Sequence, residues 1–145
     1  MENEYDAIRD KKAMLWYNSL AMAGLATLSV LSEVKDLYDE HGQLDMAIVH
    51  DKTGVSIKTL AGITAMTPQG LRNNPKSERV QRNGRRFVRI LAELTRLLGA
   101  RKDAMIWLRE PHPELESHTP LELMAKGRFE PVEILVRRLG TGAPA

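Results

Sequence analysis

The sequence predicts an all-α protein, and two observations carry that prediction. No stretch of the 145 residues keeps the apolar–polar alternation of a half-buried strand, whereas apolar residues recur with the spacing of a helix. Residues that begin helices also recur at short intervals, as at Thr67 and Thr119, each followed by proline. We expect an N-terminal helix-turn-helix lobe over residues 1–84 and a small C-terminal helical lobe over residues 85–145.

The first predicted helix is long, running from about residue 6 to residue 40 and ending at Gly42. It is apolar over much of its girth, so we expect it to be buried on more than one side, in its own core or against a second copy of the chain. Its uncharged run, 13–31, is about long enough to span a bilayer. Polar residues such as Asn18 dilute that run and the preceding residues are acidic, so we interpret it as a buried helix and expect no membrane partner.

Shorter helices follow, each marked by residues that favour helix ends. The predicted N-caps are Asp45, Ser56, Thr67, Ser77, Asp103 and Thr119. The predicted ends are Gly54, Asn74, Gly99, Glu110 before a proline, Gly127 and Gly140. The pair Asn83-Gly84 is a candidate break in the helix that begins at Ser77. At Thr119 and Glu122 the spacing is that of a capping box, in which the two side chains satisfy backbone amides reciprocally.

The pattern of residues 56–75 predicts a helix-turn-helix with a tight connection at 64–66. Ala61 is small where the two helices cross, and Leu60, Met66 and Leu71 can fill the junction. The second helix then presents polar residues that can contact base edges or phosphates, namely Thr67, Gln69, Arg72 and Asn73. Ala65 stands where glycine usually makes the turn, Gly70 weakens the second helix, and a plain helical hairpin is the alternative.

The charge of the chain is unevenly distributed. Residues 51–102 hold 12 Lys/Arg against 3 Asp/Glu, whereas residues 1–50 and 103–145 are net acidic. Within this basic centre Arg79, Arg82, Arg86, Arg89 and Arg96 recur at helical spacing. We expect Lys76, Arg79, Arg82 and Arg86 to contact DNA phosphates, with a merely solvated face as the alternative.

No catalytic arrangement is predicted, and the protein is not expected to be an enzyme. The absence of cysteine excludes disulfides, zinc–thiolate sites and a cysteine nucleophile, and it fits a reducing compartment such as the cytoplasm. His112, Glu114, Glu116 and His118 lie in a proline-containing loop without the i, i+4 spacing of a helical metal site. We therefore expect neither a metal nor a cofactor.

Residues 103–139 resemble the antitoxins of the Xre/MbcA/ParS family. The resemblance rests on Ala104-x-x-Trp107-Leu108, on Pro111 and Leu115, and above all on "TPLELM" at 119–124, followed by Gly127 and an apolar helix at 132–139. The sequence departs from the family pattern at His112, at Ser117-His118 and at Arg128-Phe129. These departures bear on which toxin the chain fits.

The resemblance implies an Xre/Cro-like N-terminal lobe and a toxin-binding C-terminal lobe. Members of the family pair with RES-domain toxins, which degrade NAD or transfer ADP-ribose; they block the NAD pocket, form dimers through the N-terminal half and repress their own operon. For this sequence, the resemblance implies that the residues near the toxin are Arg128, Phe129, Arg137, Arg138 and Thr141.

Three alternatives stay open at this level. Phe129 is either an exposed apolar anchor for the toxin or a core residue between the last two helices. The chain is either an antitoxin or a stand-alone helix-turn-helix regulator. If the weakened second helix does not bind DNA, the chain is an interaction module only.

Overall fold

The computed structural model describes residues 30–142, and every regular element in that range is helical. The elements are η1 (Ser32–Leu37), α3 (Met46–Thr53), α4 (Ile57–Thr64), α5 (Pro68–Asn73), η2 (Val80–Gly84), α6 (Arg85–Leu98), α7 (Arg101–Arg109), η3 (Pro113–Leu115), α8 (Pro120–Ala125) and α9 (Glu130–Thr141). The all-α prediction is confirmed for this part of the chain. None of its helices is long and apolar enough to cross a membrane.

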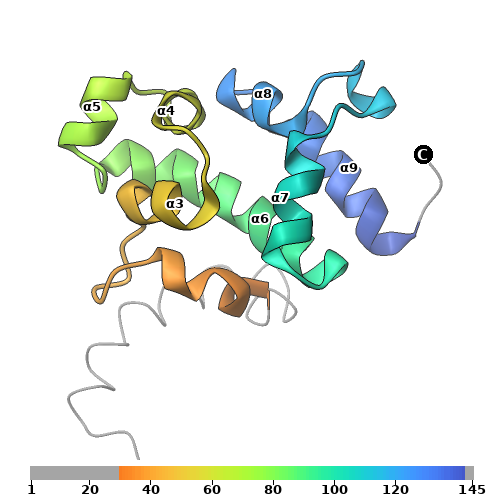
Figure 1. Cartoon of the computed structure of the whole chain (residues 1–145), viewed down its shortest axis with the longest axis horizontal. Helices are drawn as coiled ribbons and strands as arrows, with labels where there is room; N and C mark the ends of the chain where they lie inside the picture. Colours follow the sequence, from red (N-terminus) through yellow and green to blue (C-terminus); the bar gives the residue numbers. More distant parts are fainter. Residues whose placement is uncertain (1–29, 143–145) are drawn as a thin grey trace, which may run out of the picture.

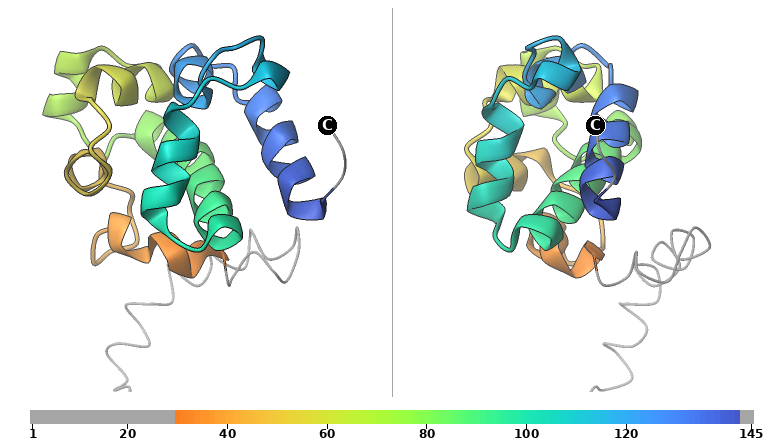
Figure 2. Two further views of the ribbon diagram at one scale, coloured as in Figure 1. Left: turned by 45° about the vertical axis from the view of Figure 1, so that its right-hand side comes forward. Right: turned by 90° about the vertical axis from the view of Figure 1, so that its right-hand side faces the viewer.

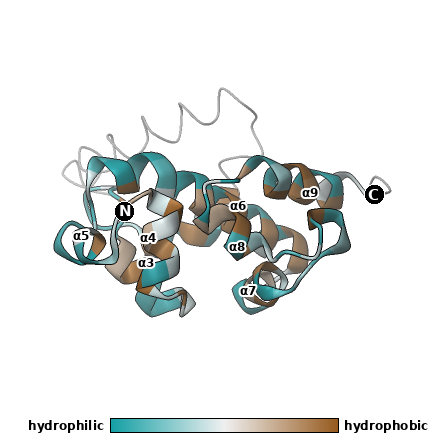
Figure 3. Ribbon diagram, turned by 90° about the horizontal axis from the view of Figure 1, so that it is seen from above, coloured by the Kyte–Doolittle hydropathy of each residue, from teal (hydrophilic) through white to brown (hydrophobic). Residues whose placement is uncertain are grey.

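Helix α6 is the central element of the fold. Helices α3, α4 and α5 gather at one end of it, and α7, α8 and α9 at the other (Figure 1). Both α7 and α9 pack on α6, which Figure 2 shows from two further sides. The apolar side of α6 faces this packing (Figure 3). Phe87, Leu91 and Leu94 are fully buried there. Buried residues from both ends of the chain join one apolar cluster, whose removal from water stabilises the fold.

Most of the predicted caps form as expected. The side chains of Asp45, Ser56, Thr67 and Thr119 each accept a hydrogen bond from a backbone N–H of the helix that follows. The cap predicted at Asp103 is wrong, because α7 begins at Arg101 and Asp103 lies inside its first turn. An acidic residue is favoured there by the partial positive charge of the helix N-terminus.

The end predicted for the last helix is also wrong. Helix α9 continues through Gly140 to Thr141, and Gly142 ends it with a φ of 69°. A methyl group at Gly140 would meet Leu97 and Glu93 only at ordinary contact distance. Gly140 is therefore an internal helical residue, and the left-handed cap lies two residues later.

From residue 30 onward, where the structure describes the chain, the first predicted helix differs from what is observed. Residues 6–29, and with them most of the uncharged run, lie outside the described residues. In the described part the helical turns end at Leu37 and Tyr38 is extended, so the predicted end at Gly42 is wrong. The carboxylate of Asp39 accepts hydrogen bonds from the backbone N–H groups of His41 (2.8 Å) and Gln43 (3.0 Å). These local bonds stabilise a turn at the expense of the helix.

The candidate break at Asn83-Gly84 is a π-helical turn rather than a break. The chain stays helical from Glu78 through η2 into α6. A methyl group at Gly84 would collide with the Met46 side chain, so glycine allows α3 to approach this turn closely. The boundary predicted between residues 84 and 85 falls inside this continuous helix, and the functional division of the chain remains a prediction.

The two ends of the fold also meet directly at α4 and α8. A Cβ atom at Gly62 would collide with the carbonyl oxygen of Ala125. The glycine therefore lets the backbones of the two helices come into contact. The predicted helix-turn-helix and the C-terminal helices consequently form one packed body over the described residues.

Candidate functional site

Helix α8 is fixed in place by hydrogen bonds at both of its ends. Thr119 Oγ1 accepts a hydrogen bond from the Glu122 N–H (3.0 Å), and Glu122 Oε2 accepts one from the Thr119 N–H (3.2 Å). At the other end of α8, Gly127 has a φ of 79° and the Arg128 N–H donates to the Leu123 carbonyl (2.8 Å). The chain thus turns sharply into α9 and leaves the Arg128 side chain in solvent.

Phe129 lies inside this turn, with only 5% of its surface exposed. Its ring packs in the apolar cluster, and the Arg86 guanidinium lies 4.9 Å above the ring centroid. The exposed-anchor interpretation of Phe129 is therefore wrong for the free chain, and the core interpretation is the one observed. The sequence could not distinguish them, because both place an aromatic residue at a turn between amphipathic helices.

Arg86 joins α6 to α9. Its guanidinium donates two hydrogen bonds to the Glu133 carboxylate, of 2.6 and 2.9 Å. These bonds raise the pKa of Arg86. The bidentate pair and the contact with Phe129 hold a side chain that the sequence assigned to DNA phosphates.

The exposed side chains of α9 include both cationic and apolar groups. Arg137, Arg138 and Thr141 are exposed, and the resemblance assigned them to toxin binding. Ile134 and Leu139 are also unusually exposed for large apolar residues, at 37% and 42%. The spacing of the apolar residues 132, 135, 136 and 139 predicts that Leu139 lies on the buried side, and the sequence does not single out Ile134. A surface that mixes arginine with apolar side chains is typical of protein interfaces.

The predicted connection between α4 and α5 is present. Ala65 adopts a left-handed φ of 58°, and the Met66 N–H donates to the Ala61 carbonyl (2.8 Å). Leu60, Ala61 and Leu71 are buried at the junction. The Arg79 guanidinium donates to the Ala65 carbonyl (2.9 Å), which helps to hold the alanine in a conformation that glycine adopts more readily.

The four candidate residues on α5 are all exposed, but they are not equally available. Thr67 Oγ1 accepts the capping hydrogen bond from the Gly70 N–H (3.0 Å), and Gln69 donates to Asn73 (3.1 Å). Arg72 projects from the last turn of α5 and makes no ion pair with any residue of 30–142. Arg72 is therefore the candidate most able to meet an external anion.

The predicted phosphate contacts beyond α5 each have an intramolecular partner. Lys76 pairs with Asp39 (2.9 Å), which raises the pKa of Lys76, and Arg82 pairs with Glu78 (3.0 Å). Arg79 and Arg86 are bound as described above. The sequence showed the arginine spacing correctly but gave no sign of the acceptors Glu133 and Asp39, which lie far along the chain.

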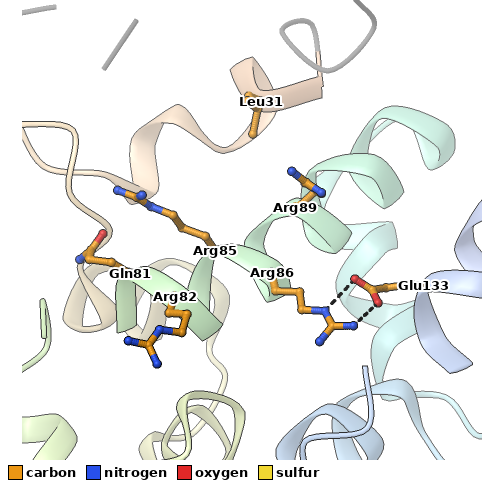
Figure 4. Close-up of a pocket in the computed structure, with 7 residues that line it drawn as sticks. All are labelled: Leu31, Gln81, Arg82, Arg85, Arg86, Arg89 and Glu133. Atoms are coloured by element: carbon orange, nitrogen blue, oxygen red, sulfur yellow. Dashed lines mark hydrogen bonds and ion pairs between the residues drawn. The ribbon is translucent and has the colours of Figure 1, made fainter. Parts of the chain in front are cut away.

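Two neighbouring cavities lie along α6 on the side of α9. The first, of about 300 Å³, is lined by Leu31, Gln81, Arg82, Arg85, Arg86, Arg89 and Glu133 (Figure 4). The second, of about 290 Å³, is lined by Arg89, Ile90, Glu93, Glu133, Val136 and Arg137. Burial lowers the pKa of Arg85 in the first cavity. Arg89 and Glu133 belong to both cavities.

The comparison with protein families decides the class of the C-terminal region. Residues 93–139 match the antitoxin Xre/MbcA/ParS C-terminal toxin-binding domain. The match begins in the second half of α6 and ends within α9. Comparison with curated proteins and with solved structures gave no match.

The match supports an antitoxin role for the chain and a toxin as its partner. The antitoxin domain contains four of the five residues that the resemblance assigned to toxin binding, because Thr141 follows its last residue. It also contains Glu93, Glu133, Val136 and Arg137 of the second cavity. The resemblance recognised in residues 103–139 is confirmed and extends ten residues further toward the N-terminus.

The histidines of the antitoxin domain have structural contacts. His112 and His118 pair through an antiparallel bridge, and the His112 ring lies 4.4 Å from the Trp107 ring between centroids. Within residues 30–142 no group of three or more His, Asp or Glu side chains is placed to hold a metal ion.

Proposed function

We propose that the chain is an antitoxin that binds a RES-domain toxin through α8 and α9 and occludes the toxin's NAD pocket. The observation that carries the proposal is the match of residues 93–139 to a toxin-binding domain. The exposed cations Arg128, Arg137 and Arg138 support it, and they lie on α9 and on the turn that joins it to the capped helix α8. A rigid surface loses little conformational entropy on binding, which favours affinity.

Co-expression with the protein encoded beside this chain tests toxin neutralisation. The unchanged chain should restore growth, whereas Arg137→Glu with Arg138→Glu should weaken binding at least tenfold, about 1.4 kcal/mol. The matched control is Lys35→Glu with Lys58→Glu, which makes the same change of charge at exposed residues of η1 and α4, outside the matched region. If the unchanged chain neither rescues growth nor copurifies with the protein encoded beside it, the proposal that it neutralises a toxin is wrong.

We also propose that the antitoxin represses its own operon as a homodimer, with α5 on the operator. The capped α4–α5 pair and the exposed Gln69, Arg72 and Asn73 support this role. Because most arginines of the basic centre are paired within the chain, we assign the main phosphate contact to Arg72. The dimer contact is assigned to the N-terminal half.

Titrating the promoter duplex of the operon at two salt concentrations tests DNA binding. Affinity should fall steeply between about 50 and 200 mM salt, as phosphate contacts require. Arg72→Glu should weaken binding at least tenfold and flatten the salt dependence, while Lys102→Glu on α7 should change neither. A chain that binds no duplex at low salt would be an interaction module without a DNA-binding role.

A further inference from the structure

The two cavities beside α6 form one continuous surface, which we call the α6–α9 groove. They share Arg89 and Glu133 and therefore adjoin each other. Helix α6 supplies one wall, and α9 supplies Glu133, Val136 and Arg137 opposite it.

The lining of the groove includes apolar side chains. Leu31, Ile90 and Val136 line it and are themselves 2–4% exposed, so they belong to the edge of the core. Their presence favours a partner that carries apolar groups as well as charge.

The charges of the groove are incompletely matched. Arg86 is neutralised by Glu133, and Arg82 pairs with Glu78. In contrast, Arg89 and Arg137 make no ion pair with any residue in the described part of the chain, and both line the second cavity. A partner carboxylate at each of these arginines would form the same kind of pair that Glu133 makes with Arg86.

The directions of the arginines exclude a single small anion as the best occupant. Figure 4 shows Arg82, Arg85 and Arg89 pointing away from one another along α6, instead of converging on one point. Arg82 is paired with Glu78 and Arg85 donates to the Gly42 carbonyl, so among these three Arg89 is the one that can meet a negative charge of a partner.

A protein segment fits the groove better than a nucleic acid backbone. Glu93 and Glu133 also line the groove, but each is already paired with an arginine of α6. The apolar side chains of the groove have no counterpart in a phosphate backbone. Arginine beside apolar side chains is also a composition enriched at protein interfaces.

We propose that the α6–α9 groove docks an acidic segment of the toxin that also carries apolar side chains, with Arg89 and Arg137 pairing to its carboxylates. The inference rests on the proposed toxin-binding function and extends it beyond α8 and α9. It makes Arg89, four residues before the matched domain begins, part of the toxin interface. The interface would then include the part of α6 that precedes the matched domain.

Arg89→Glu in the full chain tests the inference, because Arg89 lies outside α8 and α9. The probe is the purified protein encoded beside this chain, titrated calorimetrically at two salt concentrations. We expect Arg89→Glu to weaken binding at least tenfold, Arg89→Ala to weaken it less, and Lys58→Glu to leave it unchanged. Thermal unfolding of each variant checks that the fold is retained. A carboxylate-to-lysine change in the probe should restore binding to Arg89→Glu.

The outcomes separate this inference from the proposed function. If Arg137→Glu with Arg138→Glu weakens binding but Arg89→Glu does not, the antitoxin role stands and the groove assignment is wrong. If the unchanged chain does not bind the probe, both are wrong. If Arg89→Glu weakens binding to a random-sequence 20-base-pair duplex but not to the probe, the groove is a nucleic acid surface and the inference is overturned.

Discussion

Replacing Phe129 by alanine should lower the free energy of unfolding by about 3–5 kcal/mol, the usual cost of truncating a buried aromatic residue. Phe129 is 5% exposed at the turn into α9, where it contacts the apolar cluster. The substitution removes its buried apolar area and leaves a cavity. It also removes the ring beneath Arg86, which lies 4.9 Å from the ring centroid.

Because a small domain is stable by only about 5–15 kcal/mol in total, this loss is large enough to populate unfolded chain near physiological temperature. Urea unfolding followed by circular dichroism measures the loss. Phe129→Leu is the control, since it keeps most of the apolar volume and should cost markedly less. A cost below about 1 kcal/mol for Phe129→Ala would show that the ring is not a core residue.

The same pair of variants tests the function of Phe129. Because the ring is buried in the free chain, Phe129→Leu should bind the toxin as tightly as the unchanged chain. A tenfold loss of affinity in this folded variant would mean that the ring leaves the core when the toxin binds. Calorimetric titration below the unfolding temperature measures this directly.

Replacing Gly62 by alanine should destabilise the chain, whereas the same change at Gly140 should stabilise it. Both glycines lie within helices, where alanine is favoured by up to about 1 kcal/mol. At Gly62 the added methyl group collides with the backbone of Ala125, which cannot rotate away as a side chain can. Overpacking of this kind costs about 1–3 kcal/mol and outweighs the gain in propensity.

At Gly140 the methyl group meets Leu97 and Glu93 at 3.6 Å, which is ordinary contact, so the propensity gain remains. Midpoints of urea unfolding for the two variants should therefore shift in opposite directions. If Gly62→Ala is as stable as the unchanged chain, the backbones of α4 and α8 do not touch as described. Because α4 precedes the predicted DNA-binding helix, Gly62→Ala should also weaken operator binding.

Local chemistry allowed much of the fold to be predicted from the sequence. The caps at Asp45, Ser56 and Thr67 and the capping box at Thr119 depend only on side chains within three residues of the backbone groups that they satisfy. The errors arose where another local interaction prevailed. Asp39 stabilises a turn where the sequence predicts a helix. The sequence also predicts a helix end at Gly140, although α9 continues through it.

The candidate sites depended more strongly on contacts between distant residues. The spacing of Arg82, Arg86 and Arg89 showed that they share one side of a helix, but it could not show which of them already has a partner. Arg86 is bound by Glu133, 47 residues along the chain, whereas Arg89 makes no ion pair within residues 30–142. Because of this difference, we expect these arginines to meet a protein partner rather than DNA phosphates.

By itself the sequence determined the helical class, the positions of most helix ends and the resemblance of its C-terminal region to an antitoxin. Each of these depends on residue types at short separations along the chain. The tertiary structure alone decided that Phe129 is buried, that Gly62 brings α4 onto α8, and which arginines remain available to a partner. These properties depend on residues that are far apart in the sequence and meet only when burial of the shared apolar core brings the helices together.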